Sequence, residues 1–182
     1  MDAIVPDDKD WTWVLDRSCP DCALDARRLT VADLPGLLED STPRWLAALA
    51  SAGVRQRPAP GVWSVLEYAC HVRDVHRIFA ERLALVRDHS DPTFANWDQD
   101  ATAVQERYAE QDPDTVAGEL ASAAADVAEA YRTVRPEELQ RTARRSNGSV
   151  FTLETLGRYH LHDVVHHAHD IGWAGDDGPQ SS

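Results

Sequence analysis

Cysteine is scarce in this chain: Cys19, Cys22 and Cys70 are the only three among 182 residues. So few thiols, in an odd number, exclude a disulfide framework, and we expect them to be reduced. Cys19 and Cys22 form a CPDC motif with the spacing of half a zinc site or of a redox pair. A structural zinc ion needs four ligands and no second CxxC follows, so the sequence favours two ordinary, non-catalytic thiols in an N-terminal extension.

Basic residues are also few, because 18 Lys and Arg face 31 Asp and Glu and leave a formal net charge of −13. That charge repels nucleic-acid phosphates and anionic membrane surfaces, so we expect neither as a partner. No run approaches the roughly 20 apolar residues of a membrane-spanning helix. The N-terminus MDAIVPDDKDW is acidic where a signal peptide is basic and then apolar, which favours a cytoplasmic protein.

Strand-like alternation is missing as well, and apolar residues recur instead at helical spacing. Four long helices are predicted, over residues 30–53, 65–87, 113–134 and 153–171, with a short helix within 101–110. Ser64 and Glu67 form a capping box at the start of the second long helix, and Thr152 can cap the last. Pro43 predicts a kink in the first, or a restart at Ser41 or Thr42.

These elements predict an all-α protein with one four-helix bundle over residues 30–173. The segment 88–100 is polar and contains Pro, Asn and Asp, so we expect a long loop between the second and third helices. Asn147-Gly148 is typical of a tight turn. Residues 1–29 are expected to pack on the bundle through WTW (11–13), and residues 174–182 to form a disordered tail.

Histidine is concentrated in YHLHDVVHHAHD, residues 159–170, where five of the eight histidines occur. At about 100° per residue, Asp163 and His167 lie on or beside the apolar stripe of the predicted helix, and His162 and His166 lie on the opposite, polar side. Both pairs are four residues apart and can each reach one ion. On the second helix, His71 faces inward, where it needs a metal or a carboxylate such as Asp163 as its partner.

The predicted metal site is therefore His71, Asp163 and His167, with His162 and His166 as the alternative pair on the last helix. Glu67, His162 and His166 are candidates for groups that orient the metal ligands or transfer protons, although a helix cap and solvated histidines are the favoured interpretation. Cys70 is expected in the core because it points about 100° away from His71. Trp97 either lines a pocket mouth or packs the long loop onto the bundle.

With these residues in view, the chain resembles the DinB-like superfamily of four-helix bundles, which includes mycothiol-dependent maleylpyruvate isomerase. WSVLEYACH (63–71) is similar to the family pattern W-S-x-x-E-x-x-x-H, and DVVHHAHDI (163–171) is similar to its last-helix motif. CPDC, NWDQDATAVQERYAEQDP and YHLHDVVHH together look like an actinobacterial-type subgroup. Asp163 stands where the family has His, or Glu in the isomerase branch.

The resemblance implies a divalent metal ion, zinc first and nickel second, and a small-molecule substrate or a low-molecular-weight thiol such as mycothiol. A metal with open coordination positions suits thiol transfer, isomerisation or hydrolysis. The alternative is a non-catalytic metal-binding module, or a metal-free DinB-like module in which Asp163 pairs with His71. By analogy with the family, a homodimer is expected.

Overall fold

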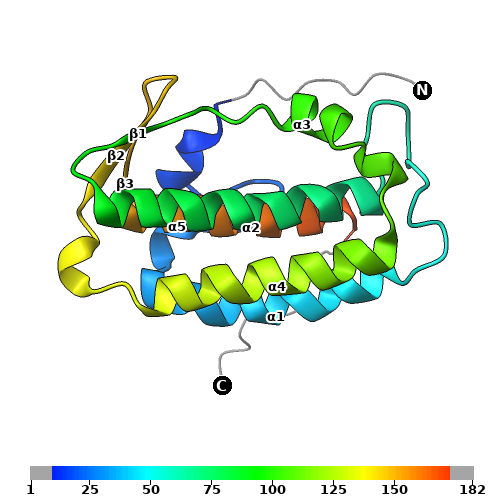
Figure 1. The fold of residues 1–182 in the computed structure, drawn as a ribbon, viewed down its shortest axis with the longest axis horizontal. Helices are drawn as coiled ribbons and strands as arrows, with labels where there is room; N and C mark the ends of the chain where they lie inside the picture. Colours follow the sequence, from blue (N-terminus) through cyan, green and yellow to red (C-terminus); the bar gives the residue numbers. More distant parts are fainter. Residues whose placement is uncertain (1–9, 173–182) are drawn as a thin grey trace.

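The computed structural model describes residues 10–172 and contains a bundle of four long helices with further segments against its sides (Figure 1). The long helices are α1 (Leu34–Leu49), α2 (Val65–Asp88), α4 (Pro113–Arg132) and α5 (Leu153–Asp170). Around the bundle they contact one another in the order α1, α4, α2, α5 and back to α1. The predicted all-α bundle is confirmed, whereas the predicted disordered tail lies outside the described residues. Within residues 10–172, every helix is too short or too polar to cross a lipid bilayer.

The starts of α2, α4 and α5 are fixed by side chains that accept hydrogen bonds from the first-turn backbone. The Ser64 side chain accepts from the Glu67 backbone N–H, while the Glu67 carboxylate accepts from the Ser64 N–H, as the capping box predicts. Thr152 and Thr155 form the equivalent pair before α5. These caps set the register of the two helices that carry the histidines.

Pro43 does not interrupt the first helix, because α1 continues through it to Leu49. The hydroxyl groups of Ser41 and Thr42 both donate to the Leu38 carbonyl, at 2.7 and 3.1 Å. Hydroxyls that bond back into the preceding turn are compatible with a helix interior. The expected restart at Ser41 or Thr42 is therefore not observed.

The long connection between α2 and α4 follows from the direction of these helices. The two helices are neighbours that run the same way, so the chain must return along the length of the bundle before α4 begins (Figure 1). Residues 89–112 make this return and contain β1 (Thr93–Phe94), α3 (Gln99–Gln105) and a single 3-10 turn (Tyr108–Glu110). The predicted loop and short helix thus correspond to a crossover that covers one side of α2.

A small sheet between α4 and α5 was not predicted. β2 (Thr142–Arg145) pairs antiparallel with β3 (Val150–Thr152), and β1 pairs parallel with β2. The expected Asn147-Gly148 turn connects β2 to β3, with Gly148 at φ 100°. Strands of two to four residues are too short to show an alternating pattern, which explains why the sequence did not reveal them.

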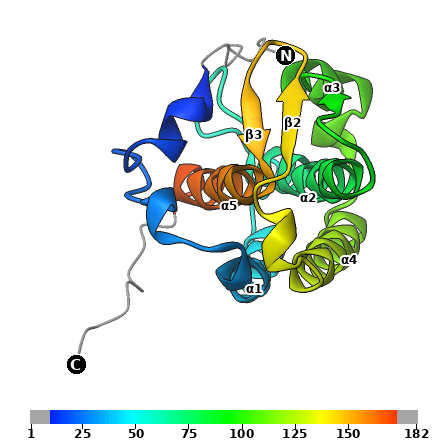
Figure 2. The ribbon, with the colours of Figure 1, turned by 90° about the vertical axis from the view of Figure 1, so that its left-hand side faces the viewer.

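The N-terminal segment, residues 10–33, is called the arm and contains three 3-10 helices (Trp11–Leu15, Ala26–Arg28 and Val31–Asp33). In Figure 2 the arm, in blue, runs beside α5 on the side away from α4. Val14 and Ala26 of the arm are buried. The arm therefore covers a face of α5 that the bundle itself leaves open.

Buried histidines also occupy the bundle core. His76 Nδ1 lies 3.0 Å from His160 Nε2, and His160 Nδ1 lies 3.1 Å from the Tyr131 hydroxyl. All three side chains are buried. This hydrogen-bonded chain explains how the inward-facing His160 is tolerated among apolar residues.

Candidate metal centres

Helices α2 and α5 bring His71, Asp163 and His167 together, and we call this group the inner site. His71 Nε2 and His167 Nε2 lie 3.2 and 3.5 Å from the same oxygen, Asp163 Oδ1. The rings of His71 and His167 are perpendicular, with centroids 4.6 Å apart. One potential ligand atom from each residue lies within 4.8 Å of the other two. The structure thus brings together the three residues of the predicted metal site.

Neighbouring residues hold the inner-site imidazoles in place. The His71 ring stacks on Trp97, with centroids 5.1 Å apart and planes at 6°, and its centroid lies 5.3 Å from that of Trp63. His167 Nδ1 lies 2.9 Å from Asp170 Oδ2, which leaves its Nε2 directed at Asp163. A carboxylate behind an imidazole fixes the ring orientation and increases its basicity, as it does for metal-binding histidines.

The electrostatics of the inner site favour its cation-binding protonation state. Burial, followed by the charge of nearby His167, lowers the pKa of His71, which is fully buried. Burial alone would raise the pKa of Asp163, but His71 and His167 outweigh it and hold that pKa below its usual value. At neutral pH the site thus presents a carboxylate and a neutral His71 imidazole.

The donor set of the inner site fits a divalent ion. Two imidazole nitrogens and one carboxylate oxygen form the type of three-ligand set that leaves coordination positions open. His71 Nδ1 is buried and has no hydrogen-bond partner within residues 10–172. Asp163 and His167 remain partly exposed, at 21% and 15% of their side-chain area, so the open side faces outward.

A second group contains Cys19 and Cys22 from the arm with His162 and His166 from α5, and we call it the arm site. One potential ligand atom from each of the four residues lies within 4.8 Å of the others. Cys19 Sγ is 3.6 Å from His166 Nδ1. The alternative last-helix pair therefore lies together with the cysteines, in a group separate from the inner site.

The favoured interpretation of His162 and His166 as solvated histidines is wrong. Only 3% and 9% of their surfaces are exposed, because the arm covers them. The Trp11 ring centroid lies 5.8 Å from that of His162 and 4.7 Å from that of His166. Helical periodicity located the pair correctly on the face away from the bundle core. It cannot show that the arm packs on that face, because the two segments are far apart in sequence, with Cys19 and His166 separated by 147 positions.

Glu67 has the structural role that was favoured for it, and Cys70 lies in the core as expected. Glu67 caps α2 and accepts a hydrogen bond of 3.0 Å from Arg57 Nε, and it forms an ion pair with the same guanidinium group. Burial would raise the pKa of Glu67, but Arg57 and Ser64 keep it below its usual value, so the group stays ionised. Cys70 is fully buried, and burial raises its thiol pKa to about 12, so the thiol stays protonated near neutral pH.

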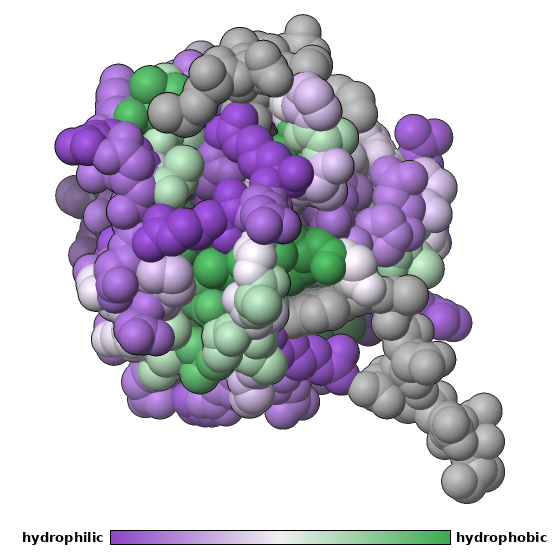
Figure 3. Space-filling view, turned by 90° about the vertical axis from the view of Figure 1, so that its right-hand side faces the viewer, coloured by the Kyte–Doolittle hydropathy of each residue, from purple (hydrophilic) through white to green (hydrophobic). Residues whose placement is uncertain are grey.

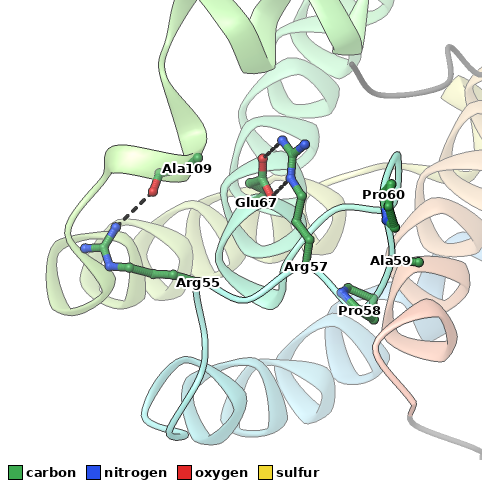
Figure 4. A pocket seen from close by; sticks show the side chains of 7 residues that line it. All are labelled: Arg55, Arg57, Pro58, Ala59, Pro60, Glu67 and Ala109. Carbon is green, nitrogen blue, oxygen red and sulfur yellow. Dashed lines mark hydrogen bonds and ion pairs between the residues drawn. The ribbon is translucent and has the colours of Figure 1, made fainter. Parts of the chain in front are cut away.

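A pocket of about 430 Å³ lies at the end of the bundle where α2 begins (Figure 4). Its lining residues are Arg55, Arg57, Pro58, Ala59, Pro60, Glu67 and Ala109. The two arginines are engaged, since Arg55 donates to the Ala109 carbonyl and Arg57 pairs with Glu67 (Figure 4). Figure 3 shows this end of the molecule, where hydrophilic side chains surround a band of hydrophobic ones. None of the inner-site residues lines the pocket.

Sequence reasoning missed Arg82, which lies with Arg145 among aromatic rings; Arg145 and Arg144 were expected to be solvated in a polar loop, with carboxylate recognition as the alternative. Arg82 on α2 is only 9% exposed, and its guanidinium lies 5.0 and 4.5 Å from the ring centroids of Phe79 and Phe94. Arg145 on β2 lies 5.8 Å from the ring of Tyr159, which is one turn before Asp163 on α5. Burial and the neighbouring charge of Arg145 lower the pKa of Arg82 to about 10.

Comparisons with known proteins agree with this fold. The family model described as the DinB superfamily matches residues 37–174. Among solved structures, the chain is similar to YfiT from Bacillus subtilis, described as "a probable metal-dependent hydrolase with an unusual four-helix bundle topology". The match has a TM-score of 0.67 and 21% sequence identity, and it covers 76% of this chain and 82% of YfiT. No curated protein sequence matches the chain.

Proposed function

Because the chain belongs to the DinB superfamily, we propose that it is a divalent-metal-dependent enzyme whose inner site holds the ion. The observation that carries this proposal is the convergence of His71 and His167 nitrogens on one oxygen of Asp163. The description of YfiT as a "probable metal-dependent hydrolase" supports the same class of chemistry. Zinc is the preferred ion, with nickel second, because imidazole and carboxylate ligands suit both.

An ion bound at the inner site would act as a Lewis acid that polarises a substrate carbonyl and lowers the pKa of a bound water or thiol. The chain's own residues would position it. Asp170 orients the His167 ring, and Trp97 and Trp63 hold the His71 ring and keep water from its buried side. Asp163, ionised at neutral pH, supplies the negative charge that retains a cation.

Hydrolysis is the reaction that this arrangement supports best. A related reaction of the same centre is the transfer of a substrate group to a low-molecular-weight thiol such as mycothiol. Both begin with a nucleophile at the partly exposed side of the inner site. Water needs no further binding determinant, whereas a thiol cofactor needs a surface that recognises it. Only the family resemblance supports a thiol as the nucleophile. The similar structure of YfiT, which is described as a probable hydrolase, supports water.

The substrate is proposed to carry a negative charge. Arg82 is buried, yet within residues 10–172 no carboxylate lies within ion-pair distance of it, and its one hydrogen bond, to the Ala95 carbonyl, is long at 3.4 Å. A buried cation without a counter-ion is costly, and a bound anion would offset that cost. Arg145 adds a second positive charge near Tyr159, one helical turn from Asp163.

The experiment combines metal analysis with a substrate screen on protein produced without a histidine tag. Metal content is measured for the wild type, for His71→Ala and for His167→Ala, and turnover is screened on carboxylate-bearing esters, thioesters and amides. The screen is repeated with mycothiol and with glutathione. The expected result is that both variants lose the metal of the inner site and lose turnover, while their circular dichroism spectra stay unchanged.

Each other outcome has a distinct meaning. If both variants lose metal but the wild type turns over no substrate, the protein is a non-catalytic metal-binding module and not an enzyme. Metal content that is the same in the wild type and both variants would refute the inner site as a metal centre. Turnover only in the presence of a thiol would identify the thiol reaction in place of simple hydrolysis.

A further inference from the structure

The arm and α5 meet at four side chains that all belong to residue types with zinc affinity. Cys19 and Cys22 come from the CPDC turn, and His162 and His166 come from one face of α5. We propose that the arm site is a second metal centre, a structural Cys2His2 zinc site that fastens the arm to the bundle. This centre is separate from the inner site and does not depend on the function proposed there.

The distance between Cys19 Sγ and His166 Nδ1 matches that of two ligands in a tetrahedral centre. With Zn–S near 2.3 Å and Zn–N near 2.0–2.1 Å, tetrahedral geometry separates a sulfur and a nitrogen ligand by about 3.6 Å. Cys19 Sγ and His166 Nδ1 are 3.6 Å apart. The four potential ligand atoms lie within 4.8 Å of one another, so a single ion can reach all of them with small side-chain adjustments.

The backbone of the CPDC turn presents both thiols to the same side. The Cys19 N–H donates to the Leu24 carbonyl at 2.9 Å, which closes the turn around Cys22. Ala23, directly after Cys22, has φ 61°, a left-handed conformation that residues other than glycine seldom adopt. The chain reverses tightly there, and the second thiol stays beside the first.

Burial indicates a structural rather than a catalytic role. Cys19, His162 and His166 are buried, and the Trp11 ring packs on both histidines. His162 Nε2 is buried without a hydrogen-bond partner within the described residues, a costly arrangement that a metal bond would remove. Four protein ligands leave no open coordination position, and two thiolates neutralise the charge of Zn²⁺.

The proposal departs from the sequence-based expectation of two ordinary thiols. That expectation rested on the lack of a second CxxC, but the remaining ligands need not be cysteines or lie close in sequence. Cys19 and His166 are separated by 147 positions. Only the packing of the arm on α5 brings the two halves together.

Cobalt substitution tests the arm site without reference to activity. The full chain, kept under reductant, is stripped of metal with a chelator and titrated with Co²⁺. Thiolate ligands give a near-ultraviolet charge-transfer absorption, and tetrahedral Co²⁺ gives intense visible bands. The inner site contains no sulfur, so the charge-transfer absorption reports the arm site alone.

Wild-type protein is expected to develop the charge-transfer absorption as one Co²⁺ per chain binds at the arm site, and to lose it when Zn²⁺ displaces that Co²⁺. The Cys19→Ser/Cys22→Ser variant should lose the absorption. The matched control His71→Ala/His167→Ala should keep it in full, although that variant removes the inner site. Failure of the function proposed for the inner site therefore leaves this result unchanged.

Two results would overturn the arm site. The first is a reduced wild-type protein that binds Co²⁺ without any charge-transfer absorption. The second is zinc content in the reduced wild type no higher than in Cys19→Ser/Cys22→Ser, with the thiols instead forming a disulfide when reductant is removed. Because the first result comes from the spectrum of the wild type alone, a misfolded variant cannot produce it.

Discussion

Asp163 has a central place in the inner site because one of its oxygens faces the Nε2 atoms of both His71 and His167. Without it, the two imidazoles would face each other with no negative charge between them. Asp163→Asn keeps the shape of the side chain but removes this charge. We expect the dissociation constant for Zn²⁺ at the inner site to rise by at least about 10–100-fold. Changes of that size are seen even when the substituted residue only hydrogen-bonds a metal ligand.

Asp163→His is the matched control, since it replaces the carboxylate with another nitrogen donor. Competition with a chromophoric chelator measures both affinities. The arm site would be removed from the measurement by the Cys19→Ser/Cys22→Ser background. Equal affinity of Asp163→Asn and the wild type in that background would contradict the role of Asp163.

Arg82 provides a test of the proposed substrate charge. In Arg82→Met the side chain can still pack against Phe79 and Phe94, but no positive charge remains. The loss of a charged hydrogen bond worth about 1.5–3 kcal/mol predicts a decrease in kcat/KM of about 10–150-fold for anionic substrates. Neutral analogues of the same substrates serve as the control, and kcat/KM for them should decrease little in Arg82→Met. An equal decrease for both would indicate a structural role for Arg82.

At the scale of single elements, the start of α2 supports the inner site. Ser64 is buried and caps the helix two turns before His71. Ser64→Ala removes the acceptor for the Glu67 backbone N–H, and we expect the free energy of unfolding to fall by about 1 kcal/mol. Urea denaturation followed by circular dichroism measures the change. Ser64→Gly should cost only a few tenths of a kcal/mol, and a larger loss in the glycine variant would argue against the capping explanation.

The starts of α2 and α5, the two helices that carry the inner-site residues, were predictable from the sequence. SVLE and Thr152 are local signals that act within one turn. The inward position of Asp163 and His167 also follows from helical periodicity. The Asn147-Gly148 turn was predictable, but the strands β2 and β3 on either side of it were not, since they are too short to show an alternating pattern. The burial of His162 and His166 depends on the arm, a contact between distant segments that no local pattern contains.

The whole molecule should lose stability in mild acid because of the histidines in its core. Burial lowers the pKa of His76 from 6.5 to about 4, and burial together with His76 lowers that of His160 well below its usual value. In the unfolded chain these groups take up protons near pH 6.5, whereas in the folded chain they stay neutral. The free energy of unfolding is therefore largest above pH 6.5 and falls as the pH decreases towards 4.

Each such histidine contributes a slope of up to about 1.4 kcal/mol per pH unit in that range. Urea unfolding at pH 7.5, 6.0 and 5.0, with chelator present throughout, measures how the free energy of unfolding depends on pH. His76→Met removes one titrating group, so its stability should fall less steeply than that of the wild type over the same range. Parallel curves for the two proteins would show that His76 does not contribute.

Asp170 lies at the end of α5 between the two groups of histidines. One of its oxygens is 2.9 Å from His167 Nδ1, and the other is 3.8 Å from His166 Nε2. A carboxylate that moves towards one ring withdraws from the other, so the two centres compete for a single counter-charge. A substitution at Asp170 would therefore affect both proposed centres at once, although each takes its ligands from a different part of the chain.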